Sequence, residues 1–253
     1  MSEGSLEGKV AIVTGGGRGM GRAIACAFAD EGADVAIIDR MPDHLAEVAG
    51  EIESRGRRAM TIEADLTEIG GLPGIFDSIT AELGEIDVLM NNAGISPALP
   101  ALETTEEIWD RILDVNAKAL FFCAQEAGRR FLARGQGGKI INTSSTYGVT
   151  VEPELAAYAA SKGAVLQITR ALASEWARHG INVNAIGPTL IQTDMTRELF
   201  DDQAYVADFL RRIPAGTLPG PTDIADAVVF LAGPRSSHVH GHLLLIDSGE
   251  LVV

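Results

Sequence analysis

Two side chains that can exchange a proton lie four residues apart in a stretch whose alanine content and apolar spacing predict a helix. They are the phenol of Tyr158 and the ammonium group of Lys162. Positions i and i+4 of a helix lie on the same face, so both groups can point at one spot. A free phenol has a pKa near ~10, and a neighbouring positive charge lowers that pKa. The spacing fits proton transfer near neutral pH, but it also occurs on ordinary helix surfaces without any chemical role.

A glycine-rich turn near the start of the chain has the setting of a phosphate-binding loop. Residues 10–13 form an apolar run that predicts a buried strand, residues 15–21 are rich in glycine, and residues 22–31 predict a helix. Glycines let the backbone approach a pyrophosphate, and a helix N-terminus attracts its charge. The spacing Gly-x-x-x-Gly-x-Gly is not the usual Gly-x-Gly-x-x-Gly, and a tight turn is the alternative. The prediction of a phosphate-binding loop therefore depends on the flanking strand and helix.

A carboxylate at the end of the second predicted strand indicates which dinucleotide the turn binds. The strand at residues 34–39 ends in Asp39, about 20 residues past the glycines, where dinucleotide folds hold the adenosine ribose. Asp39 can accept hydrogen bonds from both ribose hydroxyls and would repel a 2′-phosphate, which predicts NAD rather than NADP. Arg18 and Arg40 are compatible with NADP, because a nearby guanidinium can accommodate that phosphate.

The rest of the chain alternates short apolar strands with helical patterns. This alternation predicts one α/β domain over residues 1–253, a Rossmann-type doubly wound parallel sheet with helices on both faces. Ligands of such sheets bind beyond the carboxyl ends of the strands, where Thr14, Asp39, Asp65 and Asn91 are expected. The further strands are expected at residues 58–63, 86–90, 139–143, 181–186 and 243–246, and the further helices at 42–55, from 73, at 105–134, at 156–179 and from 222.

Three features of this pattern have more than one interpretation. Asp65 could bind an adenine amino group or stabilise a turn. Asn116 interrupts the apolar stripe of the helix at residues 105–134, at a cost because its amide competes for backbone hydrogen bonds. Its amide is either exposed or bonded locally. The charged stretch at residues 189–217 predicts a flexible lid over a substrate.

The composition excludes several classes of partner. The formal net charge of −15 opposes binding to nucleic acid or to an anionic membrane surface, since both require clustered Lys and Arg. Cys26 and Cys123 have neither metal-binding nor redox spacing and are expected to be small core residues. The first residues have no basic and apolar signal pattern, and no apolar run is long enough to span a membrane, so we expect a cytoplasmic protein.

Three histidines near the end of the chain raise the question of a metal site. His238, His240 and His242 alternate, so a strand would place their imidazoles on one face. No carboxylate or cysteine belongs to the motif. A solvated loop that enters a strand is the better interpretation, and we expect no metal.

The motifs taken together resemble the short-chain dehydrogenase/reductase family over essentially the whole chain. No single motif is specific, but their joint occurrence in this order is. The resemblance implies an oxidoreductase that interconverts a secondary alcohol and a ketone by hydride transfer with a nicotinamide cofactor. The motifs that carry it are Thr14 with Gly15, Gly19 and Gly21, Asn91 to Gly94, Asn116, Ser145, Tyr158 with Lys162, and Pro188 with Thr193.

The resemblance also implies a role for each matching residue. Tyr158 would be the general acid and base, and Lys162 would lower its pKa and bind the nicotinamide ribose. Ser145 would polarise the substrate, and Asn116 would hold a water that links Lys162 to solvent. Besides Tyr158 and Lys162, the implied cofactor contacts are Gly15, Gly17, Arg18, Gly19, Met20, Gly21, Asp39, Asp65, Leu66, Asn92, Ala93, Gly94, Pro188, Ile191 and Thr193.

Two positions depart from the family pattern. Thr189 follows Pro188 where the family usually has glycine, and Ser248 replaces the first glycine of an Asp-Gly-Gly motif. Both glycines belong where backbone freedom or close approach is expected. The cofactor pose and the room for substrate are therefore least predictable around Thr189.

The substrate is less well determined than the reaction. Residues 175–188 are similar to the branch of the family that acts on sugar acids and polyols, such as gluconate 5-dehydrogenase. A sugar acid needs a cationic partner, but residues 95–101 contain no Arg or Lys, which leaves Arg197, Arg211 or Arg212 of the lid. A 3-oxoacyl thioester or another apolar ketone is the alternative substrate.

A dinucleotide-binding regulator without turnover is the alternative from another functional class. All four residues with implied catalytic roles are present, although a regulator has no physical need of them. The family's usual association through its two long helices, together with their high apolar content, implies a homotetramer.

Overall fold

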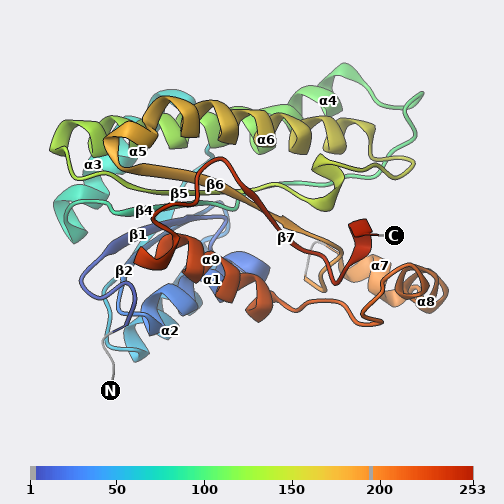
Figure 1. Cartoon of the computed structure of the whole chain (residues 1–253), viewed down its shortest axis with the longest axis horizontal. Helices are drawn as coiled ribbons and strands as arrows, with labels where there is room; N and C mark the ends of the chain where they lie inside the picture. Colours follow the sequence, from blue (N-terminus) through green and yellow to red (C-terminus); the bar gives the residue numbers. More distant parts are fainter. Residues whose placement is uncertain (1–3, 194–195, 253) are drawn as a thin grey trace.

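A seven-stranded parallel sheet forms the centre of the computed structural model, which describes residues 4–193 and 196–252 (Figure 1). The strand order is β3-β2-β1-β4-β5-β6-β7, so the chain reverses direction across the sheet between β1 and β4. This confirms the predicted doubly wound Rossmann-type sheet. The strands are β1 (Val10–Thr14), β2 (Asp34–Asp39), β3 (Ala59–Glu63), β4 (Val88–Asn91), β5 (Gly138–Thr143), β6 (Ile181–Pro188) and β7 (Leu243–Ile246).

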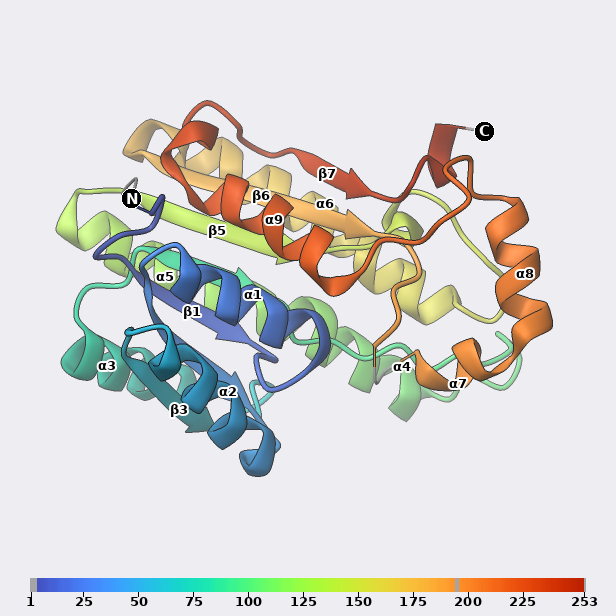
Figure 2. The ribbon, with the colours of Figure 1, turned by 90° about the horizontal axis from the view of Figure 1, so that it is seen from below.

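Helices cover both faces of the sheet and create two cores (Figure 2). Successive strand residues point to opposite faces, so Val13 and Ile37 enter one core while Ile12 and Ile38 enter the other. Since one sheet supplies both cores, the chain is a single domain. One face carries α1 (Gly19–Asp30), α2 (Pro42–Ser54) and α9 (Pro221–Ala232), and the other carries α3 (Leu72–Leu83), α4 (Glu106–Leu113), α5 (Leu120–Arg134) and α6 (Ala156–Trp176).

The long helix expected at residues 105–134 is present but contains an unexpected segment. Thr105 caps its start by accepting a hydrogen bond from the Ile108 N–H, and Gly135 ends it in the left-handed conformation. Between α4 and α5 the residues Asp114–Ala119 form a π-helical segment. Asn116 lies in this segment and is completely buried. Such π segments are frequent at functional sites.

The stretch expected to be a flexible lid is partly helical. It contains α7 (Arg197–Asp201) and α8 (Gln203–Arg211), and the Asp202 side chain caps α8. Phe209 and Ile213 are buried and anchor the stretch to the rest of the chain. Residues 194–195 of the expected lid lie outside the described residues, as do the ends of the expected domain at 1–3 and 253.

The three histidines lie in the turn before β7, which confirms the expected loop. His240 Nε2 is 3.2 Å from the Asn182 amide nitrogen. In the part of the chain that the structure describes, no three His, Cys, Asp or Glu side chains are grouped as metal ligands. Within the same described part, no helix is long and apolar enough to cross a membrane.

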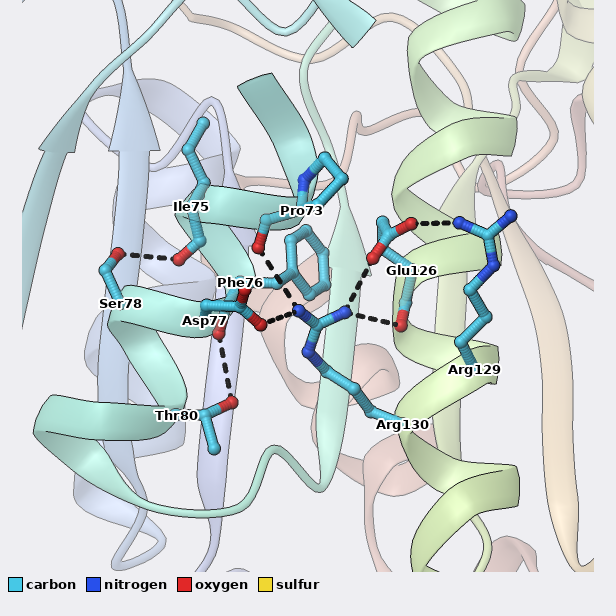
Figure 3. Close-up of polar contacts among 9 residues, drawn as sticks. All are labelled: Pro73, Ile75, Phe76, Asp77, Ser78, Thr80, Glu126, Arg129 and Arg130. Carbon is cyan, nitrogen blue, oxygen red and sulfur yellow. Dashed lines mark hydrogen bonds and ion pairs between the residues drawn. The ribbon is translucent and has the colours of Figure 1, made fainter. Parts of the chain in front are cut away.

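A buried ion-pair network joins α3 to α5 (Figure 3). The Arg130 guanidinium donates to the Glu126 carboxylate at 2.6 Å, to Asp77 and to the Pro73 carbonyl, and it lies over the Phe76 ring. The Glu126 side chain is only 7% exposed, whereas Arg129, its second partner, is 62% exposed. Arg130 therefore supplies the main compensation for a buried negative charge.

Replacing Arg130 with alanine should destabilise the protein by about 3 kcal/mol, because removal of one partner of a buried pair leaves the other charge uncompensated. Arg129→Ala is the matched control and should cost less than about 1 kcal/mol, since its guanidinium is mostly in solvent. Urea unfolding followed by circular dichroism measures both. Equal losses in the two variants would contradict the central role given to Arg130.

Candidate active site

A groove of about 230 Å³ lies where the strand order reverses, at the carboxyl ends of the central strands. Open α/β sheets bind dinucleotides at this position. The structure brings twelve of the predicted cofactor contacts to the groove: Gly15, Arg18, Gly19, Met20, Gly21, Asp39, Asp65, Leu66, Asn92, Ala93, Gly94 and Thr193. Gly17 lies beside them and donates its N–H to the Asp39 carboxylate at 3.1 Å.

The floor of this groove is bare backbone because side chains do not fit there. Gly15 has a φ of +62°, and a Cβ atom on it would lie 2.9 Å from the Ala93 Cα. A Cβ atom on Gly21 would lie 2.0 Å from the Gly15 carbonyl oxygen. The turn can therefore present N–H groups and the start of α1 to a pyrophosphate, and the groove fits a nicotinamide dinucleotide.

The ends of β1 and β4 are joined by the Thr14 hydroxyl. Its oxygen accepts hydrogen bonds from the backbone N–H groups of Asn92 and Ala93, at 2.9 and 3.1 Å. The Asn92 amide donates in turn to the carbonyls of Thr14 and Gly15. Asn91 instead points into the protein and donates to the Asn142 amide oxygen at 3.0 Å. Asn92 thus shapes the groove, and Asn91 stabilises the sheet beneath it.

The acidic residues at the adenosine end of the groove are held by local hydrogen bonds. Asp39 accepts from the N–H groups of Gly17, Arg40 and Met41. Asp65 accepts from the backbone and hydroxyl of Thr67, which lowers the pKa of its carboxyl, and it pairs with Arg40 at 3.4 Å. Asp65 therefore stabilises a turn and also lines the groove, and its contact with an adenine amino group stays a prediction.

A second cavity, of about 390 Å³, adjoins the groove. Met20 and Thr193 line both of them. Ser145 and Tyr158 lie together in this second cavity, as do Pro188 and Ile191, which were expected to contact the cofactor. The neighbouring Lys162 and Asn116 are buried behind the lining residues. The arrangement suits a dinucleotide in the groove with its reactive end at the cavity.

Burial is the main influence on the electrostatics of Tyr158 in this structure. Burial raises the pKa of the phenol, and a hydrogen bond with Ser145 offsets this only in part. The Lys162 ammonium lies 5.6 Å from the centre of the Tyr158 ring and donates to the Thr143 carbonyl at 2.8 Å. The ammonium group is therefore held beside the ring, and the lowering of the phenol pKa by Lys162 stays a prediction. Burial lowers the pKa of Lys162 itself to about 8.

Asn116 is bonded on every side, which accounts for a buried amide in a helix. Its oxygen accepts from the Ile95 N–H at 2.8 Å, and its nitrogen donates to the Ile95 carbonyl and the Ser161 hydroxyl. Ser161 donates in turn to the Tyr158 carbonyl at 2.7 Å. Gly94 packs against the amide, since a Cβ atom there would lie 3.3 Å from the Asn116 oxygen and 3.5 Å from Lys162 Nζ.

Sequence reasoning gave no role to Ser161, although it lies between Tyr158 and Lys162. The signal that could have indicated it is its place one turn after Tyr158, where a serine can bond to the helix backbone. It also gave no role to Tyr147, Glu152 and Glu154, which line the second cavity.

The two departures from the family pattern have structural counterparts. Ser248 has a φ of +53°, in the region that favours glycine, and its carbonyl accepts from the Ala215 N–H at 3.2 Å. Thr189 is buried beside the cavity, and no described group bonds to its hydroxyl.

A family model described as enoyl-(acyl carrier protein) reductase matches residues 15–250. The chain belongs to the short-chain dehydrogenase/reductase family. It is therefore an oxidoreductase that interconverts hydroxyl and keto groups with a nicotinamide dinucleotide.

Relatives of this short-chain dehydrogenase/reductase match it from end to end. It is 41% identical to 2-dehydro-3-deoxy-D-gluconate 5-dehydrogenase of Escherichia coli, over 98% of this chain and 97% of the relative. It is 36% identical to NAD-dependent glycerol dehydrogenase of Listeria innocua, over 98% and 96%. A crystal structure of gluconate 5-dehydrogenase from Burkholderia cenocepacia, in complex with NADP and tartrate, has a TM-score of 0.94 at 35% identity and covers 98% and 97% of the two chains.

Proposed function

We propose that this chain is an NAD-dependent dehydrogenase that interconverts a secondary alcohol and a ketone on a polyhydroxylated substrate, a polyol or a sugar acid. The observation that carries the proposal is the shared cavity of Ser145 and Tyr158, which adjoins the groove suited to a dinucleotide. Relatives named for sugar acids and for glycerol support the substrate class.

Each proposed catalytic group has one task. A bound nicotinamide supplies the hydride acceptor for alcohol oxidation or the donor for ketone reduction. Tyr158 takes the proton from the alcohol or returns it to the ketone oxygen. The Ser145 hydroxyl binds the same oxygen and orients it. Lys162 contributes a positive charge beside the phenol ring, and Asn116 with Ser161 holds the backbone of Tyr158 in place.

We also propose that residues 189–217 act as the lid over the substrate. Thr196, Leu199 and Tyr205 come from this stretch and line the cavity. The Ser248 carbonyl holds the end of the stretch through Ala215. The lid is therefore a pair of short helices attached at both ends, and its movement would admit and release substrate.

A substrate screen tests the proposed function. Polyols, sugar acids and secondary alcohols are incubated with the purified enzyme and NAD, and NADH absorbance is followed. We expect turnover of at least one polyhydroxylated compound. NAD binding without turnover of any of these alcohols, or of the matching ketones with NADH, would favour the regulator instead.

The enzyme should bind NAD at least about tenfold more tightly than NADP, a difference of ~1.4 kcal/mol. Asp39 lies in the groove and would repel a 2′-phosphate, and the nearby Arg40 already pairs with Asp65. Asp39→Asn removes the negative charge and should abolish most of this preference, whereas Asp43→Asn, an exposed site outside the groove lining, should leave it unchanged. Titration calorimetry measures the affinities. Equal binding of both dinucleotides by the wild type would contradict the role of Asp39.

A homotetramer in the cytoplasm is proposed as the working form. The large side chains of Trp109 and Leu132 are 42% and 41% exposed on the α4 and α5 layer, which supports association through these helices. Both described cysteines, Cys26 and Cys123, are free thiols, as is usual in a reducing compartment.

A further inference from the structure

The charged side chains that line the cavity of Tyr158 are both acidic. Glu152 and Glu154 line it, and the described lining residues include no Lys, Arg or His. The residues outside the described ranges include none of these types either. A carboxylate that leaves water for such a site loses its hydration and gains no charged partner.

The arginines of the lid do not line this cavity, although Arg211 and Arg212 line an adjoining cavity that shares Tyr147 and Glu152 with it. Arg212 pairs with Glu152 at 3.4 Å and lies over the Phe209 ring at 5.0 Å. Arg211 pairs with Asp208 on its own helix at 2.6 Å. Arg197 is exposed at the start of α7 and is not among the cavity residues. The cationic partner that a sugar acid requires is therefore missing from the cavity wall.

The two glutamates differ in how far the protein neutralises them. Glu152 accepts a hydrogen bond from the Tyr147 hydroxyl and pairs with Arg212, so its charge is shared. The Glu154 carboxylate is exposed and has no hydrogen bond or ion pair with any described residue. Within the described residues, the charge of Glu154 thus has no partner, in contrast to that of Glu152.

The position of Glu154 is fixed by its backbone. Its φ is +68°, which favours glycine, and its carbonyl accepts from the Leu99 N–H at 2.8 Å. This bond joins the loop before α6 to residues 95–101, the segment in which sequence analysis found no cation. The backbone of Glu154 is thus held at the wall of the cavity.

The other polar groups of the cavity are hydroxyls. Ser96, Tyr147, Thr196 and Tyr205 line it together with Ser145 and Tyr158. Hydroxyl groups both donate and accept hydrogen bonds, and carboxylates accept them, so this lining complements a molecule with several neutral hydroxyls.

We propose that the substrate is an uncharged polyol or carbohydrate and that Glu154 determines this specificity by rejecting carboxylates. The inference rests on the proposed function and selects one of its two substrate classes. It sets this chain apart from its relative named for 2-dehydro-3-deoxy-D-gluconate and beside its relative named for glycerol.

Matched pairs of neutral and acidic compounds test the inference. The enzyme is assayed with NAD on glycerol and glycerate, on erythritol and erythronate, and on sorbitol and gluconate. Like charges placed together cost several kcal/mol, so kcat/KM should favour the neutral member of a reacting pair by about 100-fold. A wild-type enzyme that prefers the acid, or treats both members alike, would overturn the inference while leaving the proposed function intact.

Substitutions at Glu154 locate the source of the preference. Glu154→Lys should raise the acid-to-polyol ratio of kcat/KM at least about tenfold, and Glu154→Gln should raise it less, because the lysine attracts the acid whereas the glutamine only stops repelling it. Glu154→Gly relieves the backbone conformation and should also weaken acid rejection without loss of stability. Glu85→Lys is the control, with the same charge change at an exposed site outside the cavity lining, and should leave the ratio unchanged.

The outcomes separate two kinds of failure. An unchanged ratio in Glu154→Lys, or the same shift in Glu85→Lys, would show that Glu154 does not set the specificity. If no alcohol or ketone of either charge class reacts with the nucleotide, the proposed function fails, and the inference that rests on it fails too.

Discussion

The Tyr158→Phe enzyme should lose about 10³-fold in kcat, within the range that general acid–base catalysis contributes. Its NAD affinity should change less than about threefold, because the groove that holds most of the dinucleotide is unaltered. Phenylalanine keeps the ring that lies beside Lys162 and removes only the hydroxyl to which we assign the proton transfer. Steady-state kinetics on the substrate found in the screen, combined with calorimetric titration of NAD, measures both quantities.

Tyr147→Phe is the matched control for this experiment. Tyr147 lines the same cavity, and its ring lies 6.5 Å from the Tyr158 ring. The Tyr147 hydroxyl donates a hydrogen bond to the Glu152 carboxylate, and burial together with this carboxylate raises the pKa of its phenol. The control should keep kcat within about tenfold of the wild type. A Tyr158→Phe enzyme as active as the wild type would contradict the proposed mechanism.

Lys162→Met should abolish most turnover and at the same time stabilise the protein without added nucleotide by about 2 kcal/mol at pH 7. The pKa of Lys162 falls from 10.5 to about 8 on burial, which corresponds to about 3 kcal/mol. Loss of its hydrogen bond to the Thr143 carbonyl reduces this gain in stability by about 1 kcal/mol. Such an opposition of stability and activity is common at functional sites.

The stability gain of Lys162→Met should depend on pH in a definite direction. The pKa of the folded state lies below that of the unfolded state, so only the unfolded state keeps the proton between pH 8 and 10.5. Wild-type stability therefore rises with pH in this window. The advantage of the variant should be full below pH 8 and should disappear toward pH 10.5.

Urea unfolding at pH 7 and near pH 10 measures this effect. Lys118→Met is the control, because the Lys118 side chain is 52% exposed and its removal should not produce the same pH-dependent gain. A Lys162→Met protein that is less stable than the wild type at pH 7 would contradict the assigned cost of burying the ammonium group.

The fold and the cofactor groove were predictable because their signals are local. Residues 10–31 contain a strand, a glycine turn and a helix in sequence, and the structure shows them in that order. Gly15 and Gly21 are required by close backbone contacts that recur wherever this turn packs against a helix. Some helix starts differ slightly from the predicted ones. Helix α3 begins at Leu72 and α9 begins at Pro221, each one residue earlier than predicted.

The details of the proposed catalytic site depend on contacts between distant residues, so the sequence did not reveal them. The π-helical segment forms around Asn116, whose amide bonds to Ile95 and Ser161. Lys162 on α6 is held by the carbonyl of Thr143 at the end of β5. The two helices of the lid are short and charged, and they are anchored by the burial of residues such as Phe209.

Only Met20 and Thr193 are shared between the described linings of the groove and the cavity. The Asp39 carboxylate lies at the groove and Glu154 lies at the cavity, and the two residues share no described hydrogen-bond partner. Changes at two sites that share no partners have nearly additive effects. Cofactor choice and substrate choice can therefore diverge independently during evolution. A redesign can alter one of them without a compensating substitution at the other site.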